Sequence, residues 1–366
     1  MTVTHRFSQS ISTQRDAWVE INISALERNY KKIKDIVKTE IMAVVKADAY
    51  GHGSTTLGPI LQSLGVNSFG VATVDEGISL RKAGIKVPIL ILSATPFWSY
   101  ESCHENGLTI SIYSKEQIAL LEEFSKRTAS KIKVQIKINT GMNRLGIPFK
   151  SSTQVIESLI KNNLLEVQGI YSHISTANNL EVSKLQKERF DKAIEPFKDL
   201  KLKIHITNSY SAINYPDFRY NLTRIGIALY GQEFNFLEPI ISVKGRITNL
   251  NEINSGEAVS YDRTWLSKKK STIATIPIGY ADGIDRKLSN KIIGKRNKAF
   301  VNQVGNITMD QMMFDVTKIE KPSIGDIITL IDNELPINSW AQLLDTISYE
   351  LICKLKIRLP RIYTRD

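Results

Sequence analysis

The chain has 366 residues, of which 42% are hydrophobic and 23% are charged, a composition typical of a globular protein with an apolar core. At one domain per ~150 residues, the length predicts two or three domains. No run approaches the roughly 20 apolar residues of a membrane-spanning helix, and residues 1–18 hold no apolar signal-peptide core, so we expect a cytoplasmic protein without a membrane partner.

The formal net charge of +11 is dispersed along the chain, and the densest basic run is residues 268–270. No nucleic-acid-binding motif accompanies these lysines, which indicates a solvated basic surface and no nucleic-acid partner. A positive field would also suit an anionic cofactor or an amino-acid carboxylate. The two cysteines, Cys103 and Cys353, lie far apart in sequence, so we expect neither a disulfide framework nor a metal site.

Strand-like and helix-like segments alternate from about residue 17 to residue 230. The predicted strands are 18–23, 41–45, 69–72, 89–92, 108–112, 134–138, 167–171, 203–206 and 222–225. Capping boxes that start at Ser24, Thr73 and Ser114 predict helix beginnings, and Gly65 and Gly84 predict helix ends. Such repeated strand–helix units predict parallel strands with right-handed crossovers.

The number of strands favours a (β/α)8 TIM-like barrel, in an α/β fold class with an added β domain. If 41–45 is the first barrel strand, 222–225 is the eighth, and the surplus strand 18–23 is expected to pack with the C-terminal region. We therefore predict a barrel domain over residues 17–239.

After Glu238 and Pro239 the alternation of strand-like and helix-like segments stops. The β-branched runs 240–247, 272–278 and 327–331 alternate with turn residues, and one helical pattern lies near 339–344. These features predict a C-terminal, mainly antiparallel β domain over residues 240–366.

Lys46 directly follows the first predicted barrel strand. A lysine partly shielded from water can lose its proton and act as a base or a Schiff-base nucleophile. The plainer interpretation is a charged residue that ends a buried strand. Barrel enzymes carry their chemistry at the carboxyl ends of the strands, where Lys137, His173, Ser209 and Arg224 are also expected.

The loops after strands seven and eight are where barrels commonly bind phosphate. Asn208, Ser209 and Gly226 lie in these loops, and Tyr50 and Tyr349 could add phenol donors. Taken singly, these residues could equally be ordinary loop residues.

Several segments, in this order, resemble motifs of alanine racemases, and the resemblance extends over residues 17–363. These segments are AVVKADAYGHG (43–53), KINTGMNRLG (137–146), GIYSH (169–173), RIGIALYG (224–231), GEAVSY (256–261), IGYADG (278–283) and TMDQ (308–311). The resemblance implies a pyridoxal 5'-phosphate (PLP) cofactor attached to Lys46. The other cofactor-binding residues that it implies are Tyr50, His173, Asn208, Ser209, Arg224, Gly226, Ile227 and Tyr349.

The resemblance also implies interconversion of L- and D-alanine by two bases, which would supply D-alanine for peptidoglycan. Lys46 would transfer a proton on one face of the substrate. Tyr261 would transfer a proton on the other face, and it would come from the second subunit of a head-to-tail homodimer. The implied substrate-binding residues are Arg144, Met309, Asp310 and Tyr280, with Met309 and Asp310 contributed by the partner chain and Tyr280 at a narrow entrance. Lys137 matches a lysine that many family members carbamylate.

Three positions depart from the family pattern. Asn306 and Thr308 replace an arginine and a cysteine before Met-Asp, and Asp262 replaces the glycine after the tyrosine. Two other functions remain open: a broader racemase for serine or lysine (or a related decarboxylase), and a non-catalytic PLP-binding protein. Non-catalytic PLP-binding proteins of similar fold are single barrels, so the β domain that carries Tyr261 argues against the second alternative.

Overall fold

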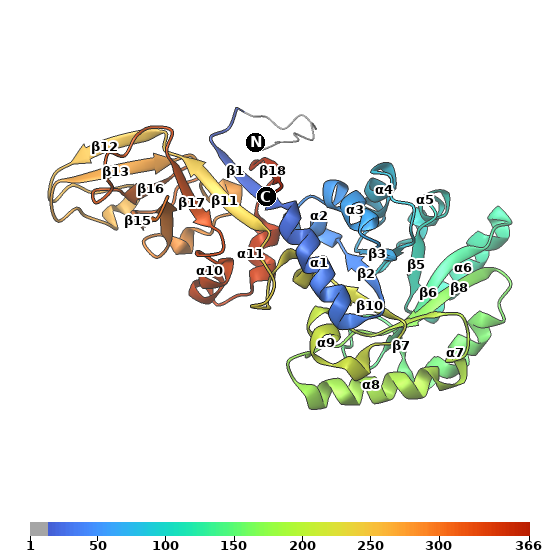
Figure 1. The fold of residues 1–366 in the computed structure, drawn as a ribbon. Coiled ribbons are helices and arrows are strands. Elements are labelled where there is room, and N and C mark those ends of the chain that lie inside the picture. Colours follow the sequence, from blue (N-terminus) through green and yellow to red (C-terminus); the bar gives the residue numbers. More distant parts are fainter. Residues whose placement is uncertain (1–13) are drawn as a thin grey trace. The chain divides into compact units, whose positions relative to one another are not determined.

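The computed structural model describes residues 14–366, which form two compact units (Figure 1). The barrel unit comprises Asn29–Ala49 and Gly53–Leu229. The C-terminal unit comprises residues 14–28, Tyr50–His52 and Tyr230–Asp366. Because the two units interleave in sequence, a single boundary at residue 239 stays a proposal. No helix within residues 14–366 is long and apolar enough to cross a membrane.

The barrel unit is built on eight parallel strands, as expected. In spatial order they are β10 (Leu222–Ile225), β2 (Glu40–Val44), β3 (Ser68–Val71), β4 (Ile89–Ile91), β5 (Thr109–Ile112), β6 (Ile132–Asn139), β8 (Leu165–Tyr171) and β9 (Lys203–His205). A short strand β7 (Ile147–Pro148) pairs with the end of β6. The eighth strand in sequence, β10, pairs with the first, β2, so the sheet curls into a nearly closed barrel. The interior is packed, with a buried cluster of Met42, Leu90, Tyr171 and Leu222.

Helices alternate with these strands along the chain and surround them in Figure 1. They are α1 (Ile23–Val37), α2 (Lys46–Gly51), α3 (Ser54–Ser63), α4 (Val74–Lys82), α5 (Tyr100–Glu105), α6 (Lys115–Thr128), α7 (Phe149–Ile160), α8 (Leu180–Ile194) and α9 (Ser209–Asn214).

The predicted helix beginnings are only partly correct. Thr73 forms the expected capping box with Glu76, and Ser114 accepts a hydrogen bond from the Gln117 N–H at 3.2 Å. The capping box at Ser24 is wrong, because α1 begins at Ile23 and the side chain of Asn22 accepts from the Ala25 N–H at 2.9 Å. Asn22 offers the same kind of acceptor two residues earlier.

The C-terminal unit contains a nine-stranded sheet. Its order is β12 (Asn249–Ile253), β13 (Ser271–Ile276), β16 (Met312–Asp315), β15 (Ala299–Val304), β14 (Ile293–Arg296), β17 (Ile327–Ile331), β11 (Ile241–Arg246), β1 (Ala17–Asn22) and β18 (Arg361–Thr364). All pairs are antiparallel except β1 with β18. The fold is therefore a TIM-like barrel with a mainly antiparallel β domain, which confirms the expected fold class.

The expectation of a single C-terminal helix is wrong. The structure has α10 (Ile337–Leu344) and also α11 (Ser348–Lys354), which carries Tyr349. With seven residues, α11 completes only about two turns, too few for a hydrophobic period to stand out in the sequence.

Candidate active site

The carboxyl ends of the barrel strands carry the predicted polar residues. Lys46 begins α2 directly after β2, and Lys137 lies in β6. His173 follows β8, Ser209 begins α9 after β9, and Arg224 lies in β10. Because parallel strands end at the same edge of a barrel, these side chains belong to one rim.

Lys46 is followed by an unusual left-handed turn. Four consecutive residues of α2, Ala47, Asp48, Ala49 and Tyr50, have φ between 52° and 55°. Left-handed backbone costs L-residues roughly 1–2 kcal/mol each, so the surrounding structure must hold this turn in place. The Asp48 carboxylate accepts from the Ser54 N–H at 2.7 Å, and the Ala47 N–H donates to the Glu76 carboxylate at 2.7 Å. The sequence suggests an ordinary strand-to-helix junction at this place.

Arg224 is the centre of the polar network inside the barrel. Its side chain is buried, and its Nη2 donates to the Ser172 carbonyl at 2.7 Å and to His173 Nδ1 at 3.0 Å. Nη2 also donates to the Ile206 carbonyl at 3.0 Å, while Nη1 bonds to His205 Nδ1. Burial lowers the Arg224 pKa to about 10, so the guanidinium remains charged at neutral pH and is fixed in orientation.

The two imidazoles that contact Arg224 are held neutral. Burial, and secondly the charge of Arg224, lowers the pKa of both His173 and His205 well below its ordinary value. Since His205 Nδ1 faces a guanidinium, the network assigns its proton to Nε2, which lies 2.8 Å from Gln135 Oε1. Sequence reasoning missed His205 and Gln135. The end position of His205 on the seventh strand is the signal that could have identified it.

Tyr171 packs beneath this network. Its ring stacks on His205 with centroids 4.9 Å apart, and its hydroxyl lies 2.7 Å from Ser111 Oγ. The Arg224 guanidinium lies 5.4 Å from the centre of the ring. Burial raises the Tyr171 pKa to about 12, so the phenol stays neutral and acts as a fixed support.

Lys137 is a buried amine in a positively charged setting. Its Nζ lies 3.4 Å from the Leu92 carbonyl and 5.6 Å from the centre of the Tyr171 ring. Burial, followed by the charges of Arg144, Arg224 and Lys46, lowers the Lys137 pKa to about 8. A small pocket here is bordered by Lys137, Arg144 and His173. Such a gathering of cations fits a ligand with anionic groups.

The loops after β9 and β10 are joined by a hydrogen bond. The Gly226 N–H donates to Ser209 Oγ at 3.0 Å, and Asn208 caps α9 by accepting from the Ser211 N–H at 3.0 Å. Ile227 begins a short 3₁₀ helix, Ile227–Tyr230. The first N–H groups of such helices lack partners inside the helix, which is the arrangement that binds phosphate oxygens in many proteins.

Tyr50 and Tyr349 lie together in the C-terminal unit. Their ring centroids are 6.1 Å apart, and Tyr50 also lies 5.2 Å from Tyr230. Burial raises the pKa of both Tyr50 and Tyr349, so these phenols are hydrogen-bond donors at neutral pH.

Tyr280, Met309 and Asp310 lie in two adjacent loops of the C-terminal unit, and Tyr261 lies in a third. The Tyr280 N–H donates to the Thr308 carbonyl and the Ala281 N–H to the Met309 carbonyl, both at 3.0 Å. A Cβ on Gly279 would lie 2.3 Å from the Thr308 carbonyl oxygen, so this close approach requires glycine. Asp310 forms an ion pair with Arg358 at 2.7 Å. Tyr261 begins a further 3₁₀ turn, and 68% of its surface is exposed.

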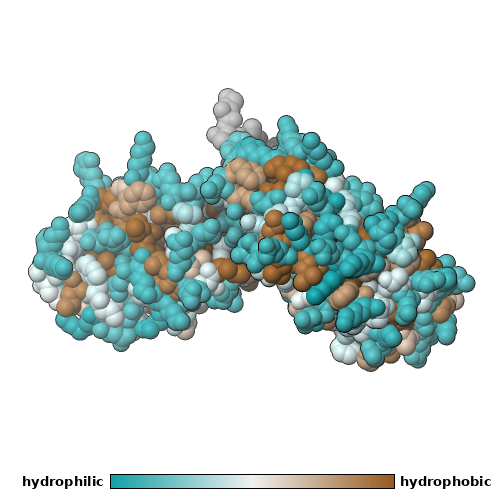
Figure 2. All heavy atoms as spheres, turned by 90° about the horizontal axis from the view of Figure 1, so that it is seen from below, coloured by the Kyte–Doolittle hydropathy of each residue, from teal (hydrophilic) through white to brown (hydrophobic). Residues whose placement is uncertain are grey.

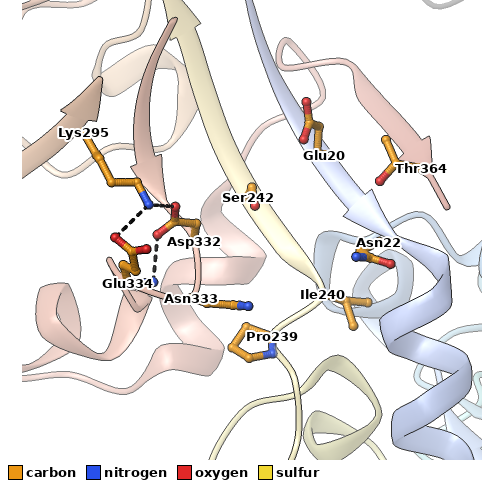
Figure 3. Close-up of a pocket in the computed structure, with 10 residues that line it drawn as sticks. All are labelled: Glu20, Asn22, Pro239, Ile240, Ser242, Lys295, Asp332, Asn333, Glu334 and Thr364. Atoms are coloured by element: carbon orange, nitrogen blue, oxygen red, sulfur yellow. Dashed lines mark hydrogen bonds and ion pairs between the residues drawn. The ribbon is translucent and has the colours of Figure 1, made fainter. Parts of the chain in front are cut away.

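A separate polar pocket lies in the C-terminal unit, with a cavity volume of about 290 Å³ (Figure 3). Lys295 at its edge pairs with Asp332 at 2.6 Å and with Glu334 at 3.1 Å. The pocket is lined by Glu20, Asn22, Pro239, Ile240, Ser242, Lys295, Asp332, Asn333, Glu334 and Thr364, none of which is a predicted site residue. Within residues 14–366, no group of three or more His, Cys, Asp or Glu side chains is placed to hold a metal ion.

Comparisons with known proteins agree with the fold. The family model for the alanine racemase N-terminal domain matches residues 21–233, and that for the C-terminal domain matches residues 240–363. An alanine racemase of Nostoc sp. is 37% identical over 367 residues, covering 94% of this chain and 95% of the relative.

Solved structures give the same result. The alanine racemase of Clostridium difficile has a TM-score of 0.91 at 32% identity and covers 96% of each chain. That of Bartonella henselae, solved with covalently bound pyridoxal phosphate, has a TM-score of 0.87 at 29% identity and covers 95% of this chain and 99% of its own. The chain therefore belongs to the alanine racemase family and is an isomerase, an amino-acid racemase.

Proposed function

We propose that this protein interconverts L- and D-alanine with PLP as cofactor and with two bases, Lys46 and Tyr261 of the partner subunit. The observation that carries the proposal is the buried Arg224 network, which lies with Lys46, Lys137 and Arg144 at the carboxyl end of the barrel. The cations Arg224, Arg144 and Lys46 at one rim suit a ligand with a phosphate and a carboxylate.

The residues present fit PLP. Ser209, Gly226 and Ile227, with Asn208 fixing the loop, supply hydroxyl and N–H donors for a phosphate. Tyr50 and Tyr349 are neutral phenols, and the family resemblance assigns them to the same group. When bound, PLP withdraws electrons from the substrate Cα and so makes its proton removable. The bound cofactor in the Bartonella henselae relative supports this assignment.

Arg224 would face the pyridine nitrogen of the cofactor. A guanidinium only donates hydrogen bonds, so that nitrogen would remain unprotonated. The neutral imidazoles of His173 and His205 hold the guanidinium in place without neutralising it. This arrangement would moderate electron withdrawal and so would favour racemisation over side reactions such as transamination.

The two bases would act on opposite faces of the substrate. The Lys46 amine would hold the cofactor and, once substrate has displaced it, would exchange a proton on one face, and the phenol of the partner's Tyr261 would exchange a proton on the other. Arg144 would hold the substrate carboxylate, with Lys137, as a carbamate, orienting it. The partner subunit's Met309 and the partner subunit's Asp310 would lie beside the substrate, and Tyr280 at its entrance.

We propose a head-to-tail homodimer, because the second base must come from a second chain in this family. Large apolar side chains exposed in the C-terminal unit are available for such an interface: Tyr261, Tyr280, Phe300 and Met309. Hydrophobic patches interrupt the hydrophilic surface on the face seen in Figure 2. We further propose, on the family resemblance alone, a cytoplasmic enzyme that supplies D-alanine for peptidoglycan.

A spectroscopic and chiral assay tests the proposal. We expect purified protein to show the absorbance of a PLP imine and to racemise alanine, and Lys46→Ala to lose both. Racemase activity in Lys46→Ala, together with no imine absorbance in the wild type, would contradict it. A panel with serine and lysine tests the substrate, because a much faster rate on serine would replace alanine as the assignment.

A further inference from the structure

The loop that carries Tyr261 has a strained backbone. Ser260 has φ 67° and ψ −169°, a conformation that is essentially restricted to glycine. Asp262 and Arg263 have φ of 61° and 50°, so left-handed residues stand on both sides of Tyr261. Strained residues persist only where surrounding contacts hold them, so something must fix this loop.

The side-chain amide of Asn306 lies at the centre of those contacts. Only 7% of Asn306 is exposed, and its Nδ2 donates to the Tyr261 carbonyl at 3.1 Å and to Asp262 Oδ2 at 3.0 Å. Its Oδ1 accepts from Thr264 Oγ1 at 3.3 Å. The Asn306 carbonyl accepts from Ser260 Oγ at 2.7 Å. Asn306 therefore forms hydrogen bonds with four residues of the turn: Ser260, Tyr261, Asp262 and Thr264.

The Asp262 side chain completes the arrangement. Its Oδ2 accepts from Asn306 and also lies 3.2 Å from Arg286 Nη2. These are the positions where the chain departs from the family pattern of arginine and glycine. An arginine has no acceptor for Thr264, and a glycine offers no carboxylate. With arginine and glycine at these two positions, neither the hydrogen bond from Thr264 to residue 306 nor the one from residue 306 to residue 262 could form.

The base of the loop is held independently of this amide. The Val259 N–H donates to the Trp265 carbonyl at 3.2 Å, and Ala258 pairs with Leu266. Val259 packs in a buried cluster with Ile273, Val304 and Met313. Loss of the Asn306 amide should therefore loosen the tip of the loop and leave the fold intact.

From these contacts we propose that Asn306 and Asp262 form a coupled pair of positioning residues that set the orientation of the Tyr261 phenol for proton transfer. The inference rests on the proposed role of Tyr261 as the second base. It goes further by assigning the placement of that base to two side chains at which this sequence departs from the usual family pattern.

A double-mutant cycle on the PLP-loaded enzyme tests the pair. We expect Asn306→Ala to lower kcat about 10- to 100-fold, since a displaced catalytic group costs factors of this size. Asp262→Ala should lower it less, and the double variant should match Asn306→Ala alone, because the pair shares one interaction. The matched control is Asn251→Ala, an exposed asparagine on β12, which should leave kcat unchanged.

Two readouts separate positioning from a general loss of structure. The α-deuterium isotope effect should rise with one alanine enantiomer and stay unchanged with the other, because only one face of the substrate uses Tyr261. Amide hydrogen exchange at residues 260–264 should accelerate in Asn306→Ala, with and without cofactor, while the Tm and the imine absorbance stay near wild type.

Three results would overturn the inference. The first is wild-type kcat and isotope effects in Asn306→Ala while Tyr261→Phe is inactive, which rejects the positioning pair alone. The second is a slower reaction in which the isotope effects with both enantiomers stay unchanged and cofactor is lost or the Tm falls, which indicates a purely structural role. The third is normal racemisation by Tyr261→Phe, which rejects the proposed base and this inference with it.

Discussion

The carboxylate of Glu76 accepts a hydrogen bond from the backbone N–H of Ala47 at 2.7 Å, directly beside the proposed catalytic lysine. The same carboxylate accepts from the N–H groups of Ala72 at 2.7 Å and Thr73 at 3.3 Å, at the start of α4. One side chain therefore caps a helix and also fixes the left-handed turn that follows Lys46.

We predict that Glu76→Ala impairs both stability and cofactor attachment. Three N–H groups would lose their partner, at a cost of about 1–3 kcal/mol in the free energy of unfolding. The turn after Lys46 would also loosen, so we expect slower formation of the imine absorbance and about 10-fold lower kcat. Urea unfolding and stopped-flow absorbance after PLP addition measure the two effects.

Thr73→Ala is the matched control for this prediction. It removes the cap hydrogen bond to the Glu76 N–H and leaves the Ala47 contact in place. We expect it to cost about 1 kcal/mol of stability with a normal rate of cofactor attachment. Equal attachment rates in Glu76→Ala and Thr73→Ala would refute the link to Lys46.

A second prediction concerns acid stability. The pKa of His205 is lower in the folded protein than in the unfolded chain, because burial and Arg224 disfavour its charged form. Below the ordinary value of 6.5 the unfolded chain therefore binds more protons, and stability is lost as the pH falls. In His205→Gln, the free energy of unfolding should fall less steeply between pH 6.5 and 5. The change in slope should correspond to at most one fewer proton taken up on unfolding. Urea unfolding over this pH range measures it, with the exposed His104→Gln as a control that should keep the wild-type slope.

A third prediction concerns carbamylation of Lys137. With its pKa lowered to about 8, roughly a tenth of this amine is neutral at pH 7, far more than for an ordinary lysine. Only the neutral amine reacts with carbon dioxide, so the carbamate should increase as the pH rises toward 8. Carbon-13 NMR after labelled bicarbonate should show a carbamate signal that Lys137→Gln abolishes. The exposed Lys203→Gln should retain it, and a wild-type spectrum without the signal would reject the modification.

The barrel was predictable because each buried strand is a short β-branched run bounded by helix signals such as Thr73 and Gly84. The same local reasoning failed at α2. Alanine disfavours a left-handed backbone, so Ala47, Asp48 and Ala49 do not predict this turn from their sequence. The contact with Glu76 that fixes it comes from 29 positions away. His205 was missed for a related reason, since its importance lies in a partner on another strand, Arg224.

The last prediction tests whether each active site combines residues of two chains. Lys46→Ala and Tyr261→Phe should each be inactive as homodimers. When the two variants are co-expressed with different tags and the heterodimer is purified, one of its two sites regains both native residues. We expect about half of wild-type activity per dimer, because the other site holds both substitutions.

The reciprocal heterodimer makes the test decisive. It pairs a wild-type chain with a chain that carries both Lys46→Ala and Tyr261→Phe. If the phenol crosses to the neighbouring barrel, the wild-type barrel faces a phenylalanine, the native tyrosine faces an alanine, and the dimer is inactive. If each chain instead uses its own tyrosine, this heterodimer keeps about half of the activity and the first heterodimer has none. The two arrangements thus predict opposite outcomes for the same pair of substitutions, so a chiral assay on both heterodimers decides between them.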